Sequence, residues 1–326
     1  MNQKKLSLIL GILLLSSFST FLYAQNQVPL VTGFDKGTYY EMGNDLTNVA
    51  GSIIISVDTV YNEDGYSLDV KKIPFIKLLS SKGAQYNFDR MVKDTGFMIV
   101  FMQYDVLVDE QYKDLKKYSK KTDSIVMIAP LGVEEIHLIT LKENKIKTLS
   151  DLKKKKVAVG AAGMGTMVTA GFIKTQTGTD WADFNLSIKD ALPALLNKQI
   201  DAFFFVGSAP VASLNGLSPT FEKLQFVPIS HPKLDPYYVK TTLPKGTYYW
   251  QKDDVQTYGV RMMLVSDLTK ESKDDKANIE RFIKELKNNI TKLQENGHPN
   301  WKKVDFNYAD IKWAPHPIAK KIFGLP

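Results

Sequence analysis

The sequence predicts an α/β protein, because short apolar runs alternate with amphipathic stretches along nearly the whole chain. Of its 326 residues, 44% are hydrophobic and 11% are aromatic, which is the composition of a packed globular protein and not of a disordered one. About 300 residues follow the N-terminal segment described next, enough to form two lobes of ordinary size.

The first 24 residues predict a cleavable export signal. Lys4 and Lys5 form a cationic start, residues 6–15 form an apolar run too short to span a bilayer, and small residues lead to Ala24, after which we expect cleavage. A membrane anchor left in place is the alternative. The chain has no cysteine, so it can form neither a disulfide nor the lipid-modified cysteine of an anchored protein. We therefore expect a freely diffusing periplasmic protein.

The first half of the chain predicts five strands and two helices. The expected strands cover residues 28–34, 53–59, 67–70, 76–80 and 96–103. The expected helices cover residues 38–49 and 85–92. The turn 62–65, of sequence Asn-Glu-Asp-Gly, joins the second and third strands in a hairpin. Thr38 and Glu41 have the spacing of a capping box at the start of the first helix.

The second half repeats the alternation, first in an expected second lobe and then in a segment that we expect to return to the first. The expected strands cover residues 135–140, 156–160, 184–188, 200–207 and 258–266. The expected helices cover residues 148–153, 166–176, 189–198 and 274–295. A proline-rich passage over 228–244 is expected to return the chain to the first lobe. The predicted organisation is a signal peptide at 1–24, lobe I at 25–129 plus 232–326, and lobe II at 130–231.

Charge and composition argue against several functions. The formal net charge of +7 comes from 42 basic and 35 acidic residues spread along the chain. The densest cluster, Lys153 to Lys156, is expected to be a solvated helix end, so we expect no nucleic-acid partner. The four histidines lie far apart with no second ligand at metal spacing. We expect no enzyme, no metal and no cofactor, although an exported hydrolase built from scattered carboxylates remains an alternative.

Two segments share one design, in which a strand runs through a glycine turn into a helix start. They cover residues 31–41 and 157–166. The free N–H groups of a first helical turn and the positive end of the helix dipole suit a carboxylate. In an open α/β sheet such turns lie where ligands bind. The second segment lacks the lysine of a P-loop and the third glycine of a dinucleotide site. Ordinary tight turns are the alternative for both.

Several motifs, in order along the chain, resemble those of a known family. They are Gly37-Thr38-Tyr39-Tyr40-Glu41-Met42-Gly43, Ser80-Ser81-Lys82-Gly83-Ala84-Gln85-Tyr86-Asn87, Gly96-Phe97-Met98-Ile99-Val100-Phe101-Met102-Gln103-Tyr104-Asp105, Val157-Ala158-Val159-Gly160-Ala161-Ala162-Gly163-Met164-Gly165-Thr166 and Asp201-Ala202-Phe203-Phe204-Phe205-Val206-Gly207-Ser208-Ala209-Pro210. The set is similar to the TAXI family of solute receptors, the extracytoplasmic components of one class of tripartite ATP-independent periplasmic (TRAP) transporters. The chain departs from the family pattern at Phe34-Asp35-Lys36, where small residues are usual, and at Met164, where serine is common.

This resemblance implies a two-lobed periplasmic-binding-protein fold (type II-like) with a hinge and a ligand cleft between the lobes. It also implies a monomer that captures a small organic anion, such as an amino acid or a dicarboxylate, and delivers it to a TRAP-type membrane permease. A sensory binding protein that serves a signalling partner is the alternative. The resemblance, taken with the two glycine turns, predicts eight ligand-binding residues, which are Thr38, Tyr39, Ser81, Gln103, Gly163, Gly165, Thr166 and Phe205. Tyr39 is equally consistent with a core aromatic.

Overall fold

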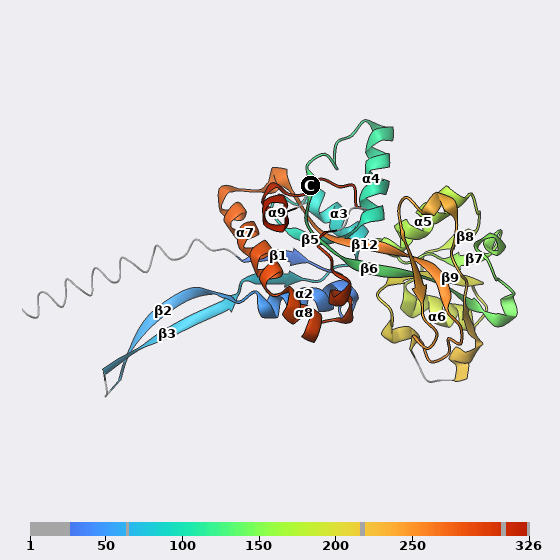
Figure 1. The fold of residues 1–326 in the computed structure, drawn as a ribbon, viewed down its shortest axis with the longest axis horizontal. Coiled ribbons are helices and arrows are strands. Elements are labelled where there is room, and N and C mark those ends of the chain that lie inside the picture. The colour runs from blue at the N-terminus through green and yellow to red at the C-terminus, as the bar shows by residue number, and fades with distance from the viewer. Residues whose placement is uncertain (1–26, 63–64, 216–218, 308–310, 325–326) are drawn as a thin grey trace, which may run out of the picture.

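The computed structural model describes residues 27–62, 65–215, 219–307 and 311–324. The export signal expected at residues 1–24 lies outside these ranges. Two lobes lie side by side and are joined by a shared sheet (Figure 1). None of the helices in the described ranges is long and apolar enough to cross a membrane.

A single ten-stranded sheet runs through both lobes. Its main path is, in order, β4 (Ile76–Leu79), β1 (Val28–Val31), β5 (Ile99–Gln103), β12 (Val255–Asp267), β6 (Ile125–Leu141), β9 (Ala202–Gly207), β7 (Lys156–Ala158) and β8 (Ala182–Phe184). Two further strands are β10 (Leu224–Phe226), which pairs with β6, and β11 (Val239–Leu243), which pairs with β12. The outer strands of each lobe are parallel, whereas the central β12 and β6 are antiparallel to their neighbours.

The long strand β6 carries the chain from one lobe to the other. Its first part pairs with β12 as far as Glu135, and from Glu135 to Thr140 it pairs with β9. Glu135 lies opposite both Gly259 and Gly207. The backbone at Glu134 and Glu135 therefore passes between the lobes within a strand and not within a loop.

Eight α-helices of the described ranges cover the faces of this sheet (Figure 1). They are α2 (Thr38–Val49), α3 (Ala84–Lys93), α4 (Tyr104–Lys117), α5 (Gly165–Thr177), α6 (Ile188–Leu196), α7 (Lys273–Asn288), α8 (Ile290–Asn296) and α9 (Pro317–Phe323). Short 3₁₀ turns connect them, among them Leu149–Leu152 where the sequence predicts a helix. The helix expected over 38–49 is confirmed. The helix expected over 274–295 is interrupted at Asn289 and forms α7 and α8.

The capping box predicted at Thr38 and Glu41 is wrong. The N-cap of α2 is Gly37, and no side chain caps this helix. The Thr38 hydroxyl instead accepts a hydrogen bond from the Ser208 N–H at 3.3 Å, across the boundary between the lobes. The Thr38 hydroxyl therefore forms a contact between the lobes. The capping-box rule considers only residues close in sequence and cannot detect such a contact.

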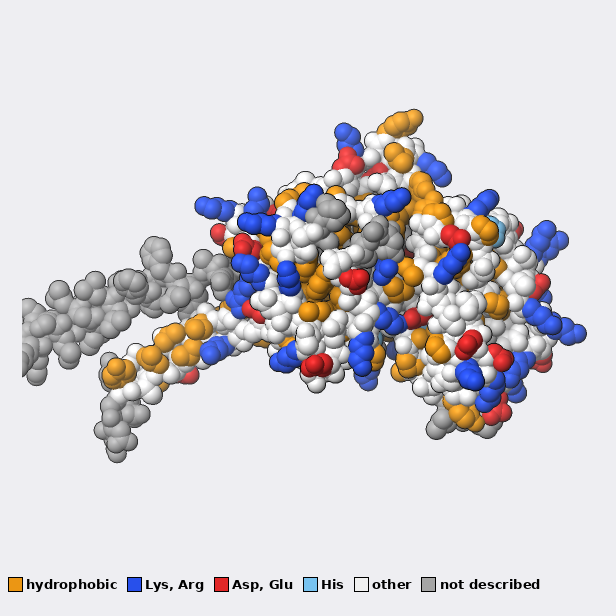
Figure 2. All heavy atoms as spheres, viewed as in Figure 1, with side chains coloured by type: hydrophobic (Ala, Val, Ile, Leu, Met, Phe, Trp, Pro, Cys, Tyr) orange, Lys and Arg blue, Asp and Glu red, His pale blue; other side chains and the backbone are white. Residues whose placement is uncertain are grey.

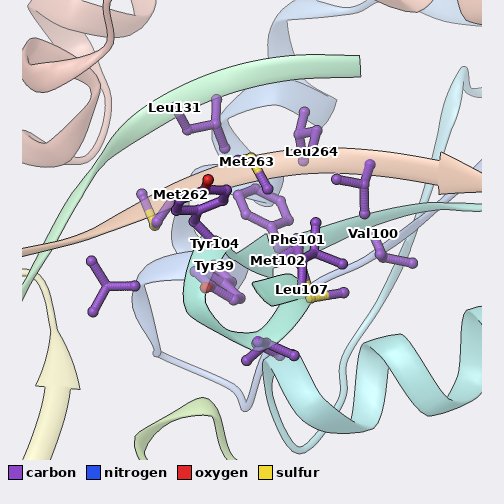
Figure 3. Close-up of a cluster of buried hydrophobic side chains, with 14 of the residues drawn as sticks. Tyr39, Val100, Phe101, Met102, Tyr104, Leu107, Leu131, Met262, Met263 and Leu264 are labelled. Atoms are coloured by element: carbon purple, nitrogen blue, oxygen red, sulfur yellow. The ribbon is translucent and has the colours of Figure 1, made fainter. Parts of the chain in front are cut away.

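Buried apolar side chains form two clusters. The larger fills lobe I and continues under lobe II, and its centre is shown in Figure 3, where Tyr39 lies against Phe101 with ring centroids 5.0 Å apart. The smaller lies on the other face of the lobe II sheet. Strand β9 contributes to both, because successive side chains point to opposite faces: Phe203 and Phe205 enter the smaller cluster and Phe204 the larger.

The lobe ranges stay predictions, and one observation bears on their boundary. Tyr248 and Trp250 belong to the smaller cluster, on the lobe II side of the sheet, although they fall within the range 232–326 expected for lobe I. Burying each such aromatic side chain contributes on the order of 2–3 kcal/mol to folding. Lobe II therefore draws part of its core from the returning chain.

A two-stranded hairpin projects away from the body of the protein (Figure 1). Its strands are β2 (Ser52–Asn62) and β3 (Gly65–Pro74), which pair with each other in a sheet of their own. The predicted hairpin is confirmed, and both strands are longer than expected. We call residues 52–62 and 65–74 the arm.

Candidate functional site

A cavity of ≈ 340 Å³ lies between the lobes. Lobe I contributes the loop and helix start 33–39, together with Lys82, Gly83 and Gln103. Lobe II contributes residues 164–166 and 205–208. A space of this size, enclosed by two lobes, fits a small molecule.

Two helices begin at this cavity, one from each lobe. Helix α2 starts after Gly37 and α5 starts after Met164, and neither has a side-chain cap. The first N–H groups of a helix have no partner within the helix, and they lie at the positive end of its dipole. The residues at both starts line the cavity, so hydrogen-bond donors from opposite lobes face one space.

The charged side chains around the cavity are mostly basic. Lys36, Lys82 and Lys189 line it, together with Asp35 and Glu134. Glu134 is only 4% exposed, and burial raises the pKa of its carboxyl to about 8. Its Oε2 atom accepts a hydrogen bond from Gln103 Nε2 at 3.1 Å. The three lysines outnumber the two carboxyl groups, so the side chains that line the cavity carry a net positive charge, and the raised pKa of Glu134 increases it at neutral pH.

Tyr39 and Gln103 form the floor of the cavity on the lobe I side. The Tyr39 ring is part of the core, and its hydroxyl lies next to Glu134 in surroundings whose burial raises the pKa of Tyr39 well above its usual value. The Gln103 Oε1 atom is buried and has no hydrogen-bond partner among the described residues. Tyr39 is therefore a core aromatic that also lines the cavity, and its contact with a ligand stays a prediction.

Gly165 is needed at its position for a reason that the sequence does not reveal. A Cβ atom on Gly165 would overlap the side-chain amide of Gln103, which comes from the other lobe. The absence of a side chain at Gly165 therefore leaves room for the Gln103 side chain, and it can also leave room for a ligand. A substitution such as Gly165→Val would displace Gln103 as well as fill the cavity.

The structure brings six of the eight predicted ligand-binding residues to the cavity wall. These six are Thr38, Tyr39, Gln103, Gly165, Thr166 and Phe205. Ser81 and Gly163 do not line it. The Ser81 hydroxyl donates to Thr32 O at 2.9 Å and accepts from Gly83 N at 3.1 Å. Gly163 O accepts a hydrogen bond from Tyr86 N at 3.0 Å. Ser81 and Gly163 therefore hold neighbouring backbone in place and do not themselves line the cavity.

Three charged residues and one loop at the cavity wall were not predicted from the sequence. Lys82, Lys189 and Glu134 were not predicted, nor was the wall formed by residues 208–213. A signal for Glu134 does exist, because Glu134 and Glu135 are adjacent carboxylates inside a 17-residue strand that is otherwise apolar at almost every position. Buried carboxyl groups are rare and mark candidate functional sites.

The loop at 208–211 is attached to β6 by a network of hydrogen bonds. Ala209 N donates to Glu135 Oε2 at 2.9 Å, and Glu135 also forms an ion pair with Lys303. Val211 N donates to the Tyr248 hydroxyl at 3.0 Å. This attachment fixes one wall of the cavity to the strand that crosses between the lobes.

His137 belongs to this network and not to the cavity. Its Nδ1 atom bonds the Glu135 carbonyl oxygen at 2.9 Å and must donate, so its Nε2 atom accepts from the Tyr248 hydroxyl at 2.6 Å. Burial lowers the pKa of His137 to about 4. The imidazole is therefore a neutral structural acceptor. Within the described ranges, no cluster of three or more histidine, aspartate or glutamate side chains is placed to hold a metal ion.

The fold and this cavity define a class of protein. Two α/β lobes, connected by strands of a shared sheet and facing each other across a small-molecule cavity, are the architecture of the periplasmic binding proteins. Residues 30–317 match the sequence profile of the NMT1-like family. The chain belongs to that family.

Three bacterial proteins are among the solved structures to which this chain is similar. PhnD1 from Prochlorococcus marinus, in complex with methylphosphonate, is 12% identical, with 92% of this chain and 96% of that chain covered and a TM-score of 0.48. MatC from Rhodopseudomonas palustris, with bound malate, is 14% identical, with 82% and 88% covered and a TM-score of 0.48. The amino acid ABC transporter substrate-binding protein AbpA from Streptococcus pneumoniae, bound to L-arginine, is 13% identical, with 87% and 95% covered and a TM-score of 0.42.

Proposed function

We propose that this protein is a periplasmic solute receptor that captures a small organic anion between its lobes. One observation carries the proposal: uncapped helix starts from opposite lobes, at Gly37 and Met164, open onto a single cavity. Backbone N–H groups at helix starts bind carboxylates without requiring a full positive charge. Lys36, Lys82 and Lys189 add attraction, while the protonated Glu134 adds no repulsion.

The ligand is a small carboxylate, such as an amino acid or a dicarboxylate, and the receptor delivers it to a TRAP-type membrane permease as a TAXI-type component. This part of the proposal is supported by the ordered motifs between residues 37 and 210. Thr38, Gly165 and Thr166 bind the carboxylate, whereas Gln103 and Phe205 shape the rest of the cavity. The N-terminal signal directs the protein to the periplasm, where the ligand is collected.

A thermal-shift panel tests the anionic ligand. Each carboxylic acid is compared with its own amide, and the candidates are chosen after mass spectrometry of the small molecules that copurify with the protein. We expect one or more carboxylates to raise Tm in a saturable manner and their amides to do so much less, because an amide cannot supply the charge that the helix starts and lysines attract. Amides that bind as tightly as the acids would contradict the proposal.

Lysine substitutions then place the ligand in this cavity. Lys82→Gln and Lys189→Gln remove one positive charge from each lobe at the cavity wall. Each is expected to weaken binding of the carboxylate about tenfold, or roughly 1.4 kcal/mol. Lys153→Gln is the matched control, because Lys153 is exposed and does not line the cavity. Equal losses in all three variants would indicate general charge attraction and no specific site.

A further inference from the structure

The arm has one apolar face that nothing in the described structure covers. Strand register places Val57 opposite Val70 and Thr59 opposite Leu68, and Tyr66 shares their face because every second residue of a strand does. On this face Val57 is 41% exposed, Val70 37%, Leu68 58% and Tyr66 72%. Figure 2 shows the hydrophobic side chains in a row along the projecting arm.

The opposite face of the arm is polar and acidic. It carries Asp58 and Asp69, which lie directly across from each other, and Lys71, whose Nζ atom lies 3.9 Å from Asp58 Oδ2; such charges are best left in water. From Val57 to Val70 the sequence has four acidic residues and neither lysine nor arginine. Lys71 and Lys72 follow directly, so only the tip of the arm is repelled by anionic lipid.

An amphipathic hairpin of this kind needs a partner for its apolar face. A two-stranded ribbon in water is at best marginally stable, and a third strand or a second packed layer stabilises it. A second arm fits this requirement, because stacking two apolar faces leaves all the aspartates on the outside. Two identical faces related by a twofold axis form a contact that closes on itself.

We propose that two copies of this protein associate by stacking the apolar faces of their arms. The exposed apolar face lies within residues 57–61 and 66–70, a ribbon about 17 Å long, and two such faces bury at most on the order of 1,000 Å² in total, at the lower limit for a specific interface. The dimer is therefore weak and depends on concentration. It replaces the monomer expected from the sequence and does not depend on the identity of the ligand.

Sedimentation velocity of the mature protein tests the dimer. Between about 5 μM and about 500 μM the weight-average mass is expected to rise from that of one copy towards that of two. Val57→Glu, on the apolar face, should weaken association at least tenfold. Val60→Glu is the matched control, because Val60 is a valine of the same strand that is 47% exposed and shares the polar face with Ser67. It should change association less than twofold.

A wild-type mass that stays at one copy over the whole range would overturn the proposal, as would equal effects of the two glutamate substitutions. Cysteine cross-linking provides a second measurement that keeps the arm apolar. The chain has no cysteine of its own, so Leu68→Cys and Ser67→Cys place a single thiol on the apolar or the polar face. A short bis-maleimide should link Leu68→Cys into dimers and leave Ser67→Cys monomeric. Equal yields would also overturn the proposal.

Discussion

Glu134 is the residue at the cavity whose pKa is changed most clearly by its surroundings. It lies where β6 leaves β12 and begins to pair with β9, so both lobes shield it from water. Burial is the main reason for its raised pKa of about 8, with smaller contributions from the nearby carboxylates of Glu135 and Asp105. Hydrogen bonding to Gln103 acts in the opposite direction and lowers the pKa. A neutral carboxyl here is compatible with the proposed anionic ligand because it can donate a hydrogen bond without repelling that ligand.

Glu134→Gln is expected to stabilise the protein at pH 8 and to leave its stability unchanged near pH 4.5. Between the ordinary pKa of 4.5 and the folded pKa of about 8, the unfolded chain ionises Glu134 while the folded chain keeps the proton. The wild type therefore loses stability as pH rises through this window. Glutamine removes the titration and still accepts the bond from Gln103. The measurement is the difference in Tm between the two proteins from about pH 5 to about pH 8.

A difference in Tm that stays constant across this range would contradict a buried, proton-bearing Glu134. The comparison with the variant matters because other groups also titrate here. Burial raises the pKa of Asp105 to about 6 and lowers that of His137 to about 4. The effect of His137 is common to both proteins and cancels in the difference, whereas Asp105 interacts with Glu134 and adds a smaller contribution to it.

At the scale of elements, the wall loop at 208–211 shows how a segment without regular structure is positioned. It is attached at Ala209 to Glu135 and at Val211 to the hydroxyl of Tyr248. Tyr248 is held in turn by His137 and by stacking on Trp250, with ring centroids 5.7 Å apart. The returning chain thus supports a cavity wall that lies about forty positions earlier in the sequence.

Tyr248→Phe is expected to lower the free energy of unfolding by about 1–3 kcal/mol. The substitution keeps the ring but leaves the Val211 N–H and the His137 Nε2 atom without their partner, and unpaired buried polar groups are costly. Tyr249→Phe is the matched control, because Tyr249 is exposed and its hydroxyl bonds only the surface residue Glu222. Urea unfolding measures both. Similar losses in the two variants would show that the buried network contributes little.

Elements with a strong local pattern could be predicted from the sequence, and those defined by distant partners could not. The helix over 38–49 and the hairpin were found because apolar periodicity and a turn signal mark them. Helix α4 was not predicted. Three of its acidic residues, Asp105, Glu110 and Asp114, are buried, and charged residues at buried positions hide the apolar periodicity of the helix. The first half of β6 was missed because Pro130 interrupts the pattern.

The parts of the candidate site formed by backbone at the helix starts could be predicted from the sequence. The side chains that distant segments bring to the cavity could not. The two glycine turns in the sequence predicted the helix starts that the structure places at Gly37 and Met164. Lys82 and Lys189 have no distinguishing pattern, because an exposed lysine and a lysine at a cavity wall look alike in sequence. Ser81 and Gly163 were assigned to the ligand, although their bonds go to Thr32, Gly83 and Tyr86.

At the scale of the whole molecule, a few hydrogen bonds between the lobes surround the cavity. Tyr86 N donates to Gly163 O at 3.0 Å, and Ser208 N donates to Thr38 Oγ1 at 3.3 Å. Further from the cavity, Thr169 Oγ1 donates to the buried Asp105 Oδ2 at 2.6 Å. Each of these bonds exists only while the lobes are close. For the proposed receptor, we expect these bonds to contribute to the balance between open and closed arrangements, which a ligand shifts by binding the closed one more tightly.

Thr38→Val is expected to shift this balance towards the open arrangement. Valine keeps the shape of threonine but leaves the Ser208 N–H without its acceptor when the lobes close, at a cost of roughly 0.5–1.5 kcal/mol. We expect a larger radius of gyration without ligand, measured by small-angle X-ray scattering, and an affinity weakened at least threefold. Because Thr38 is also proposed to contact the ligand, the radius without ligand is the measurement that isolates its role in closure. Thr47→Val is the control, because its hydroxyl bonds Gly43 O within α2. An unchanged radius and affinity in Thr38→Val would contradict this role.

The position of β12 at the centre of the sheet, between β5 and β6, has a consequence for biosynthesis. This strand begins at Val255 and ends at Asp267, so lobe I cannot complete its sheet until more than four fifths of the chain has been made. Pairings this distant in sequence form slowly. The sheet of lobe I therefore stays incomplete for most of synthesis, and a lobe that has not folded can still be threaded through a narrow secretion channel.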